Sequence, residues 1–329
     1  MQDTEAVMPV NKKTNVTGIK TGNSGFSING SKGSKALIET IMEIIFFVCA
    51  IFAVIAVAAI TIYMIISGAP ALMKVGIVDM LFNTVWQPTA AEPSFGIAYI
   101  VLTSIIGTAF AIVLGVPVLT AVFISEVAHK KVAAVVKPAV ELLAGIPSIV
   151  YGLLGLLIIN PLMYKLELAI FKDNPNHQFT GGANLISAVI VLAIMILPTV
   201  INVSYTSLQA VPVKMRQASL ALGATEVQTI FKVTIPAAKS GIITAIVLGV
   251  GRAIGEAMAI VLVSGNAVNM PLPFNSVRFL TTGIVSEMSY SSGLHRQALF
   301  TIGLVLFVFI MIINITISKI IKAGEESGK

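Results

Sequence analysis

The amino-acid sequence predicts an all-α polytopic membrane protein with six transmembrane helices. Of its 329 residues, 56% are hydrophobic and 11% are charged, and the mean hydropathy is +0.95. A globular protein typically has about 25% charged residues, so this composition excludes an ordinary water-soluble fold. Strands of an outer-membrane barrel alternate polar and apolar residues over about ten positions, whereas the long apolar segments here are apolar on every face. We therefore expect membrane lipid to surround most of the chain.

Six segments are long enough to cross a bilayer as helices, which requires about 20 apolar residues. They are residues 44–66, 95–124, 142–163, 185–208, 241–263 and 298–318. The fifth contains Arg252 and Glu256 but is otherwise almost entirely apolar or small. The first is too long for the apolar core of a signal peptide, so we expect it to remain as a membrane helix.

These segments divide the chain into four regions. Residues 1–35 are rich in Gly, Ser, Asn, Thr and Lys and are expected to form a disordered cytoplasmic tail. Residues 36–94 hold the first transmembrane helix and an outer loop. Residues 95–322 form a core of five transmembrane helices, and residues 323–329 form a cytoplasmic C-terminal tail.

The basic residues predict the orientation in the cell (plasma or inner) membrane. With the N-terminus inside, about three times as many Lys and Arg residues fall on the cytoplasmic side as on the other, and such an excess marks the cytoplasmic side. Both termini are then cytoplasmic. The same bias explains the net charge of +6 without nucleic-acid binding. Glu126 and Glu141, near inner helix ends, are expected to face water.

Several familiar motifs are incomplete. Residues 25–32 have glycines spaced as in a phosphate-binding loop, but Ser31 stands where that loop requires lysine. We therefore expect no nucleotide site, no cofactor and no catalytic residue in this chain, which is not itself an enzyme. Three glycines near Arg252 have the spacing of close helix packing; they are Gly249, Gly251 and Gly255. The three histidines fall in separate loops, so no metal site is expected.

The loop of residues 209–240 is too long for a simple connector. Pro212 is well placed to begin a helix, Gly223 interrupts the apolar pattern, and Pro236 follows a second apolar stretch. The loop therefore predicts two short helices joined at Gly223. An interfacial helix lying on the bilayer is the alternative.

This loop resembles the cytoplasmic EAA loop of ABC importer permeases, with matching spacing. The residues that carry the resemblance are Gln217, Ala218, Ser219, Gly223, Val233, Ile235 and Pro236. Gln217 and Ser219 stand where the motif usually has Glu and Ala. The resemblance implies a type I ABC importer permease fold in which residues 217–236 form a coupling helix that contacts a separate ATPase.

Arg252 lies at the centre of its apolar segment, where a charge costs about 2.5–3.5 kcal/mol on insertion scales. Glu256 is four residues further along, so on a continuous helix the two side chains share a face and can pair. A salt bridge that only fixes packing is one interpretation. The other is an oxyanion path, because guanidinium is a permanent donor to phosphate-like oxygens and Glu256 can accept the proton of hydrogen phosphate.

A wider resemblance covers most of residues 95–310 and includes ELLAGIPSIVYG at 141–152 and GRAIGEAMAIVLVSGN at 251–266. These segments are similar to phosphate ABC transporter permeases of the PstC type, in which Arg252 and Glu256 match the transport-associated pair. The resemblance implies four partners: a PstA-type permease subunit, a PstB-type ATPase dimer that binds ATP and Mg, an extracytoplasmic phosphate-binding protein, and inorganic phosphate. A PstA-type role, a permease for another oxyanion, an ion-coupled secondary transporter and a membrane scaffold remain alternatives.

Overall fold

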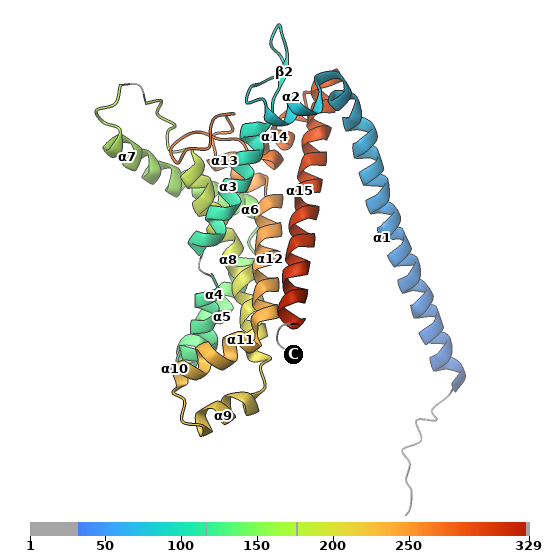
Figure 1. Cartoon of the computed structure of the whole chain (residues 1–329), viewed down its shortest axis with the longest axis vertical. Coiled ribbons are helices and arrows are strands. Elements are labelled where there is room, and N and C mark those ends of the chain that lie inside the picture. Colours follow the sequence, from blue (N-terminus) through green and yellow to red (C-terminus); the bar gives the residue numbers. More distant parts are fainter. Residues whose placement is uncertain (1–31, 116, 176, 327–329) are drawn as a thin grey trace, which may run out of the picture. The chain divides into compact units, whose positions relative to one another are not determined.

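The computed structural model describes residues 32–115, 117–175 and 177–326 (Figure 1). Residues 1–31, most of the predicted N-terminal tail, lie outside the described part, as do residues 327–329 of the predicted C-terminal tail. The chain divides into two units, Met1–Ala59 and Ile60–Lys329. The second unit contains all the candidate site residues. The four predicted regions stay a prediction.

The elements of the described residues are mostly α-helices, with three π-helical turns (η) and one pair of short strands. In chain order they are α1 (Lys32–Val75), α2 (Ile77–Phe82), β1 (Trp86–Gln87), β2 (Ser94–Phe95), α3 (Ala98–Gly115), α4 (Pro117–Val122), η1 (Phe123–Val127), α5 (Lys130–Ala144), α6 (Ser148–Leu154), η2 (Gly155–Ile159), α7 (Asn160–Ile170), α8 (Leu185–Gln209), α9 (Val213–Ala221), α10 (Glu226–Thr229), η3 (Ile230–Thr234), α11 (Ile235–Ala237), α12 (Lys239–Gly255), α13 (Met258–Val263), α14 (Leu280–Glu287) and α15 (Gly293–Glu326).

Five helical stretches of the described residues are long and apolar enough to cross a membrane. They are Leu37–Val75, Ala98–Val127, Ser148–Ile170, Leu185–Gln209 and Gly293–Thr316. Each overlaps one of the predicted segments, which confirms the all-α polytopic fold class. Helices suit this role because they satisfy their own backbone hydrogen bonds where water is absent.

The third span begins later than predicted, at Ser148 and not at residue 142. α5 ends at Ala144, and Pro147 occupies the N-cap position of α6 with extended backbone angles. Proline lacks the N–H that a continuing helix would need and restricts the residue before it. The Tyr151 hydroxyl donates to the carbonyl of Leu143 at 2.6 Å, which satisfies one backbone group left open by the break.

The fifth predicted segment, 241–263, is wrong as a single helix. α12 ends at Gly255, Glu256 is extended with φ −74° and ψ 129°, and α13 begins at Met258. α12 is long and apolar enough to cross a membrane only together with Glu226–Ala237, and the two helices are bent by 69° relative to each other. If these two helices are counted as one bent span, the described residues hold up to six candidate spans.

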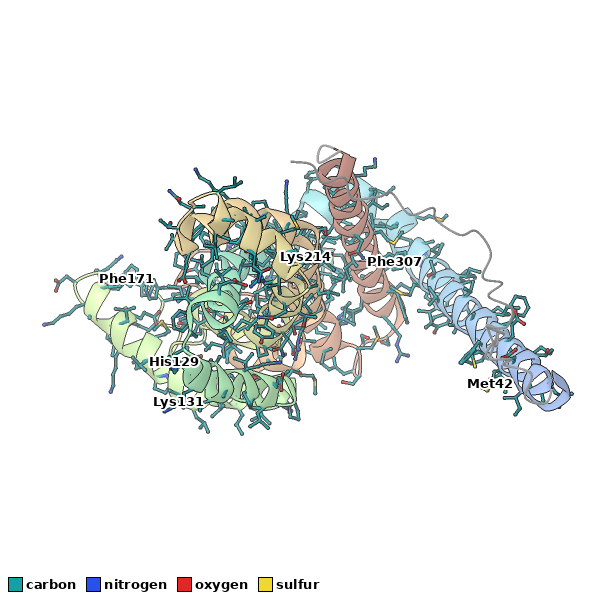
Figure 2. All side chains as sticks on the ribbon, turned by 90° about the horizontal axis from the view of Figure 1, so that it is seen from below. Met42, His129, Lys131, Phe171, Lys214 and Phe307 are labelled. Atoms are coloured by element: carbon teal, nitrogen blue, oxygen red, sulfur yellow. The ribbon has the colours of Figure 1, made fainter. Side chains whose placement is uncertain are left out.

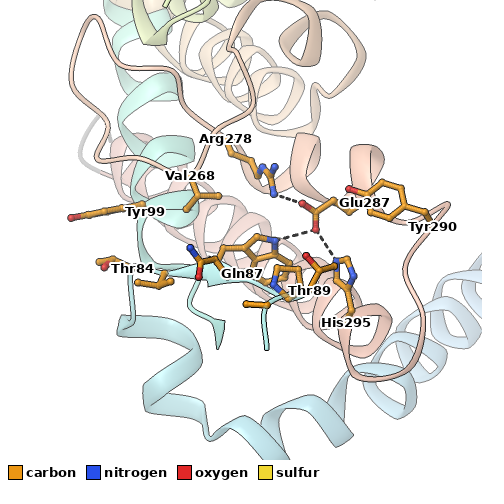
Figure 3. Close-up of a pocket in the computed structure, with 13 residues that line it drawn as sticks. Thr84, Gln87, Thr89, Tyr99, Val268, Arg278, Glu287, Tyr290 and His295 are labelled. Carbon is orange, nitrogen blue, oxygen red and sulfur yellow. Dashed lines mark hydrogen bonds and ion pairs between the residues drawn. The ribbon is translucent and has the colours of Figure 1, made fainter. Parts of the chain in front are cut away.

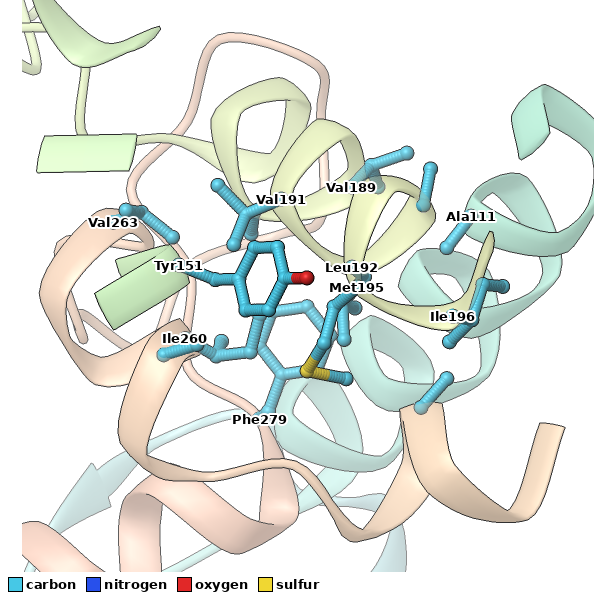
Figure 4. Close-up of a cluster of buried hydrophobic side chains, with 14 of the residues drawn as sticks. Ala111, Tyr151, Val189, Val191, Leu192, Met195, Ile196, Ile260, Val263 and Phe279 are labelled. Atoms are coloured by element: carbon cyan, nitrogen blue, oxygen red, sulfur yellow. The ribbon is translucent and has the colours of Figure 1, made fainter. Parts of the chain in front are cut away.

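Helix α8 is the centre of the core. In its most apolar window 61% of the residues are buried, against 28% for α15, so α8 faces protein on most sides. α3, α4 and α12 all pack against it. Figure 4 shows the surrounding cluster, in which Tyr151 and Phe279 lie against α8 side chains such as Leu192 and Met195.

The two ends of this helical core differ. At one end, β1 and β2 form a short antiparallel hairpin in which Trp86 faces Phe95, close to α14 (Figure 1). α9 lies at the opposite end (Figure 1). We call these the hairpin end and the α9 end.

Candidate functional site

Arg252 lies in the last turn of α12, and its side chain is half-buried. Its Nη1 donates to the Thr199 hydroxyl of α8 at 2.9 Å. The C-terminal end of a helix carries partial negative charge, which stabilises a cation there. Within the described residues the other N–H groups of this guanidinium have no protein acceptor, so they are available to an oxyanion.

Glu256 is held by the helix that follows, and not by Arg252. Its Oε1 accepts from the backbone N–H of Ala259 at 2.9 Å, at the N-terminus of α13, where the helix dipole favours negative charge. Its own carbonyl accepts from the Thr281 hydroxyl at 2.6 Å.

The salt bridge between Arg252 and Glu256, one of the two interpretations that the sequence left open, is not formed among the described residues. The extended backbone at Glu256 removes the continuous helix that would place the side chains one turn apart. Each charge is instead stabilised by a different helix end. The interpretation of the two residues as a packing salt bridge loses its basis.

The glycines around Arg252 have two roles. A Cβ at Gly249 would come within 2.6 Å of Val200 on α8, so this glycine permits close helix packing, as predicted. Gly251 and Gly255 have no atom within 4 Å of such a Cβ. The packing explanation is therefore wrong for these two glycines within this chain, and they leave open space beside Arg252.

The loop after α8 forms two helical stretches joined at Gly223, as predicted. α9 ends before Gly223, whose φ is +86°, a region that glycine enters without steric cost. Thr225 and Gln228 then form a capping box that begins α10. The second stretch continues through Pro236 to Ala237, so Pro236 does not follow it as expected.

The motif residues of this loop are mostly at the surface. Gln217, Ala218, Gly223 and Pro236 are exposed, and Ser219, Val233 and Ile235 are intermediate. The most exposed large apolar side chains among them are Leu222 at 89%, Val227 at 64% and Phe231 at 57%. We call these three the apolar knob. Exposed apolar surface of this kind is typical of a protein–protein or a membrane interaction site, so the interfacial-helix alternative stays open.

Arg216 and Glu126 form a partly buried ion pair at the α9 end. The Arg216 Nη1 lies 2.9 Å from Glu126 Oε2, and the Glu126 side chain is 6% exposed. The expectation that Glu126 is solvated is therefore wrong. Glu141 is exposed and lies 3.9 Å from Lys137.

Glu287 organises a charged cluster at the hairpin end (Figure 3). Its Oε2 accepts from Trp86 Nε1 at 3.0 Å and lies 2.8 Å from His295 Nε2, and its Oε1 accepts from Arg278 Nη1. The cluster borders a cavity of about 870 Å³. Burial, and then the Glu287 carboxylate, raise the pKa of the nearby Tyr290 hydroxyl.

The sequence interpretation missed this cluster as well as the Arg216 pair. Trp86 is 201 positions from Glu287, and no periodic pattern predicts a contact at that separation. The one local signal is that Arg278 and Glu287 are charged residues in a stretch with few other charges.

The sequence of this chain is similar to those of known membrane transport proteins. Residues 111–323 match the family model "Binding-protein-dependent transport system inner membrane component". The probable ABC transporter permease protein YqgH of Bacillus subtilis is 34% identical, over 88% of this chain and 94% of that protein. The phosphate transport system permease protein PstC of Pasteurella multocida is 32% identical, over 76% of this chain and 82% of that protein.

Among solved structures, an inward-facing MetNI methionine ABC transporter chain matches with a TM-score of 0.48 and 19% identity, over 70% of this chain and 94% of that one. The family model covers well over half of the sequence, and the relatives above match it over most of their own length. The chain belongs to the family of binding-protein-dependent transport system inner membrane components, the membrane-spanning permeases of ABC importers.

Proposed function

We propose that this permease imports inorganic phosphate, with Arg252 and Glu256 along the path of the anion. The observation that carries the proposal is the Arg252 guanidinium, which makes one hydrogen bond, to Thr199, beside the open space at Gly251 and Gly255. A guanidinium fork matches the oxygens of a phosphate and keeps its charge. The relatives named as phosphate permeases support the same substrate.

Glu256 supplies the selectivity in this proposal. Its Oε1 is engaged with Ala259, and its second oxygen has no protein donor within the described residues. That oxygen can accept the proton of hydrogen phosphate, which sulfate lacks at neutral pH. A permease for another oxyanion is the alternative.

The partners follow from the family. We propose a PstA-type permease subunit beside this chain, a PstB-type ATPase dimer that holds ATP and Mg, and an extracytoplasmic phosphate-binding protein. The apolar knob and the motif residues around Gly223 contact the ATPase. The α9 end is cytoplasmic, as are both termini, because basic residues gather there. Figure 2 looks toward that end and labels Lys131 and Lys214, which are both exposed.

Copurification and ATP hydrolysis test the assembly. The chain is expected to copurify with the ATPase and the second permease subunit. In proteoliposomes, ATP hydrolysis is expected to rise when the phosphate-loaded binding protein is added. Phosphate uptake by the purified chain alone, driven by an ion gradient, would contradict the proposal and favour a secondary transporter.

Two substitutions test the path. Arg252→Gln removes a charged donor and is expected to reduce phosphate uptake by about tenfold or more, because hydrogen bonds to charged groups are worth about 1.5–3 kcal/mol. Glu256→Gln adds an amide donor and is expected to let sulfate compete with phosphate. Unchanged uptake in Arg252→Gln, with the complex intact, would indicate a scaffold or a different path.

A further inference from the structure

Helix α9 is attached to the rest of the chain by very little apolar packing. None of its residues is buried. Met215 of α9 and the residues just before the helix line a hollow of about 520 Å³, together with Ala237, Ala238, Ser240 and Gly241 near the base of α12. Its position relative to the membrane helices therefore depends largely on polar contacts.

Among the described residues, two side chains of α9, Ser219 and Arg216, make polar contacts that reach different parts of the chain. The Ser219 hydroxyl lies 2.9 Å from that of Thr229, which ties α9 to α10 within the same loop. Arg216 reaches the membrane helices instead. Its Nη1 donates to Glu126 Oε2 at 2.9 Å, and its Nη2 donates to the Leu208 carbonyl at 2.7 Å.

This second contact is rigid because of the shape of guanidinium. The planar fork presents donors in fixed directions, and here two of them engage two different elements, η1 through Glu126 and the end of α8 through Leu208. The Glu126 carboxylate is also fixed on its other side, since Oε1 accepts from the Ser125 hydroxyl at 2.8 Å. A displacement of α9 therefore displaces both elements.

The elements that Arg216 contacts lead to the candidate substrate path. η1 directly continues α4, and α4 packs against α8. α8 in turn carries Thr199, the hydrogen-bond partner of Arg252. A continuous chain of contacts joins the loop surface to the guanidinium in the membrane.

Stability alone is a poor explanation for this pair. A buried ion pair is often no more stabilising than apolar residues of the same size, and this one is incomplete. The Nε of Arg216 is buried and has no hydrogen-bond partner within the described residues. An unsatisfied buried donor costs about 1–3 kcal/mol.

We propose that Arg216 and Glu126 are positioning residues that transmit the movement of α9 to α4 and α8 during transport. The proposal rests on the proposed function in one respect: α9 must be the surface that the ATPase moves. Neither residue touches the substrate. Their role is to turn a displacement at the loop into a displacement of the helices that line the path.

The experiment compares four forms of the complete transporter with the wild type. Arg216→Gln and Glu126→Gln each break the pair. The double variant Arg216→Met with Glu126→Leu replaces the pair with apolar side chains that keep the packing. Glu141→Gln is the matched control, because Glu141 is also paired with a basic residue, Lys137, but its side chain is 53% exposed. ATPase copurification, thermal unfolding, uptake and ATP hydrolysis are measured for each.

The single variants are expected to retain the ATPase but to transport about tenfold less phosphate per ATP hydrolysed, a loss typical of broken coupling between two sites. The apolar double variant is expected to recover thermal stability and to remain uncoupled. Glu141→Gln is expected to behave as the wild type.

Recovery of transport in the apolar double variant would show that the pair serves packing only and would overturn the proposal. The proposal would also be overturned if the single variants transported as much phosphate per ATP as the wild type. Loss of ATPase binding in both single variants and in the double variant would overturn it as well. A wild-type complex that does not import phosphate would contradict the proposed substrate only. The role of Arg216 and Glu126 would then be tested by measuring how strongly the binding protein stimulates ATP hydrolysis in each variant.

Discussion

The hairpin end and the α9 end of the permease each contain a buried glutamate paired with an arginine, but the two pairs are built differently. Glu287 meets three side chains, from β1, from the segment before α14, and from α15. Glu126 meets Arg216 and its neighbour Ser125. The first is a closed cluster of four side chains, and in the second one arginine of α9 reaches η1 and the end of α8.

The difference indicates which end is built to move. Charges with several short contacts fix one geometry, because moving any partner leaves the others unpaired in a region of low dielectric. The Arg216 and Glu126 pair involves one side chain of α9 and one of η1, so the two can be displaced together. We therefore expect the hairpin end to be the more stable and the α9 end the more responsive to a bound partner.

The largest effect is expected for Glu287→Gln. The substitution leaves Arg278 without its counter-ion, and the Arg278 side chain is only 14% exposed. Removing one partner of a buried pair costs about 3–5 kcal/mol. Thermal unfolding of the purified protein measures the loss, with the exposed Glu92→Gln as control. Equal midpoints for the two variants would contradict the closed-cluster interpretation.

A smaller loss is expected for Glu126→Gln, about 1–3 kcal/mol. Its partner Arg216 is 23% exposed, so water partly replaces the missing carboxylate. The same unfolding assay gives the value. If Glu126→Gln destabilises the protein more than Glu287→Gln, the order of the two ends proposed above is reversed.

Gly223 and Gly293 form a matched pair for separating strain from function. Both have positive φ, +86° and +52°, and neither has an atom within 4 Å of an added Cβ. Gly223→Asp and Gly293→Asp are each expected to cost about 1–2 kcal/mol, the usual penalty for a left-handed residue. Only Gly223→Asp is expected to abolish ATPase association and uptake. Loss of ATPase association in Gly293→Asp as well would remove the distinction between the ends.

The smallest effect concerns the pKa of Tyr290, which burial raises first and the Glu287 carboxylate second. In Glu287→Gln this pKa is expected to fall, because the carboxylate that disfavours ionisation of the hydroxyl is gone. Because the pKa is raised in the fold, its contribution to stability exists below about pH 10 and is lost as the pH rises through the folded value. A spectrophotometric titration, with Tyr290→Phe subtracted, measures the shift.

The sequence predicted the spans well, because five of them are long apolar runs whose length alone decides the structure. The prediction of one continuous helix over residues 241–263 failed at Glu256. Hydropathy does not reveal this break, because the segment is apolar on both sides of it. Local signals did predict the joint at Gly223. The Arg216–Glu126 and Trp86–Glu287 contacts join residues 90 and 201 positions apart. Contacts at such separations depend on tertiary packing, which no local pattern predicts.

The break at Glu256 also has a consequence for biosynthesis. The hydroxyl that satisfies its carbonyl belongs to Thr281, 25 residues later in the chain. A ribosome therefore delivers the broken helix to the translocon before it delivers the group that completes it. Nascent chains that end between α13 and α14 lack this hydroxyl, and a carbonyl left without a donor in an apolar environment costs free energy.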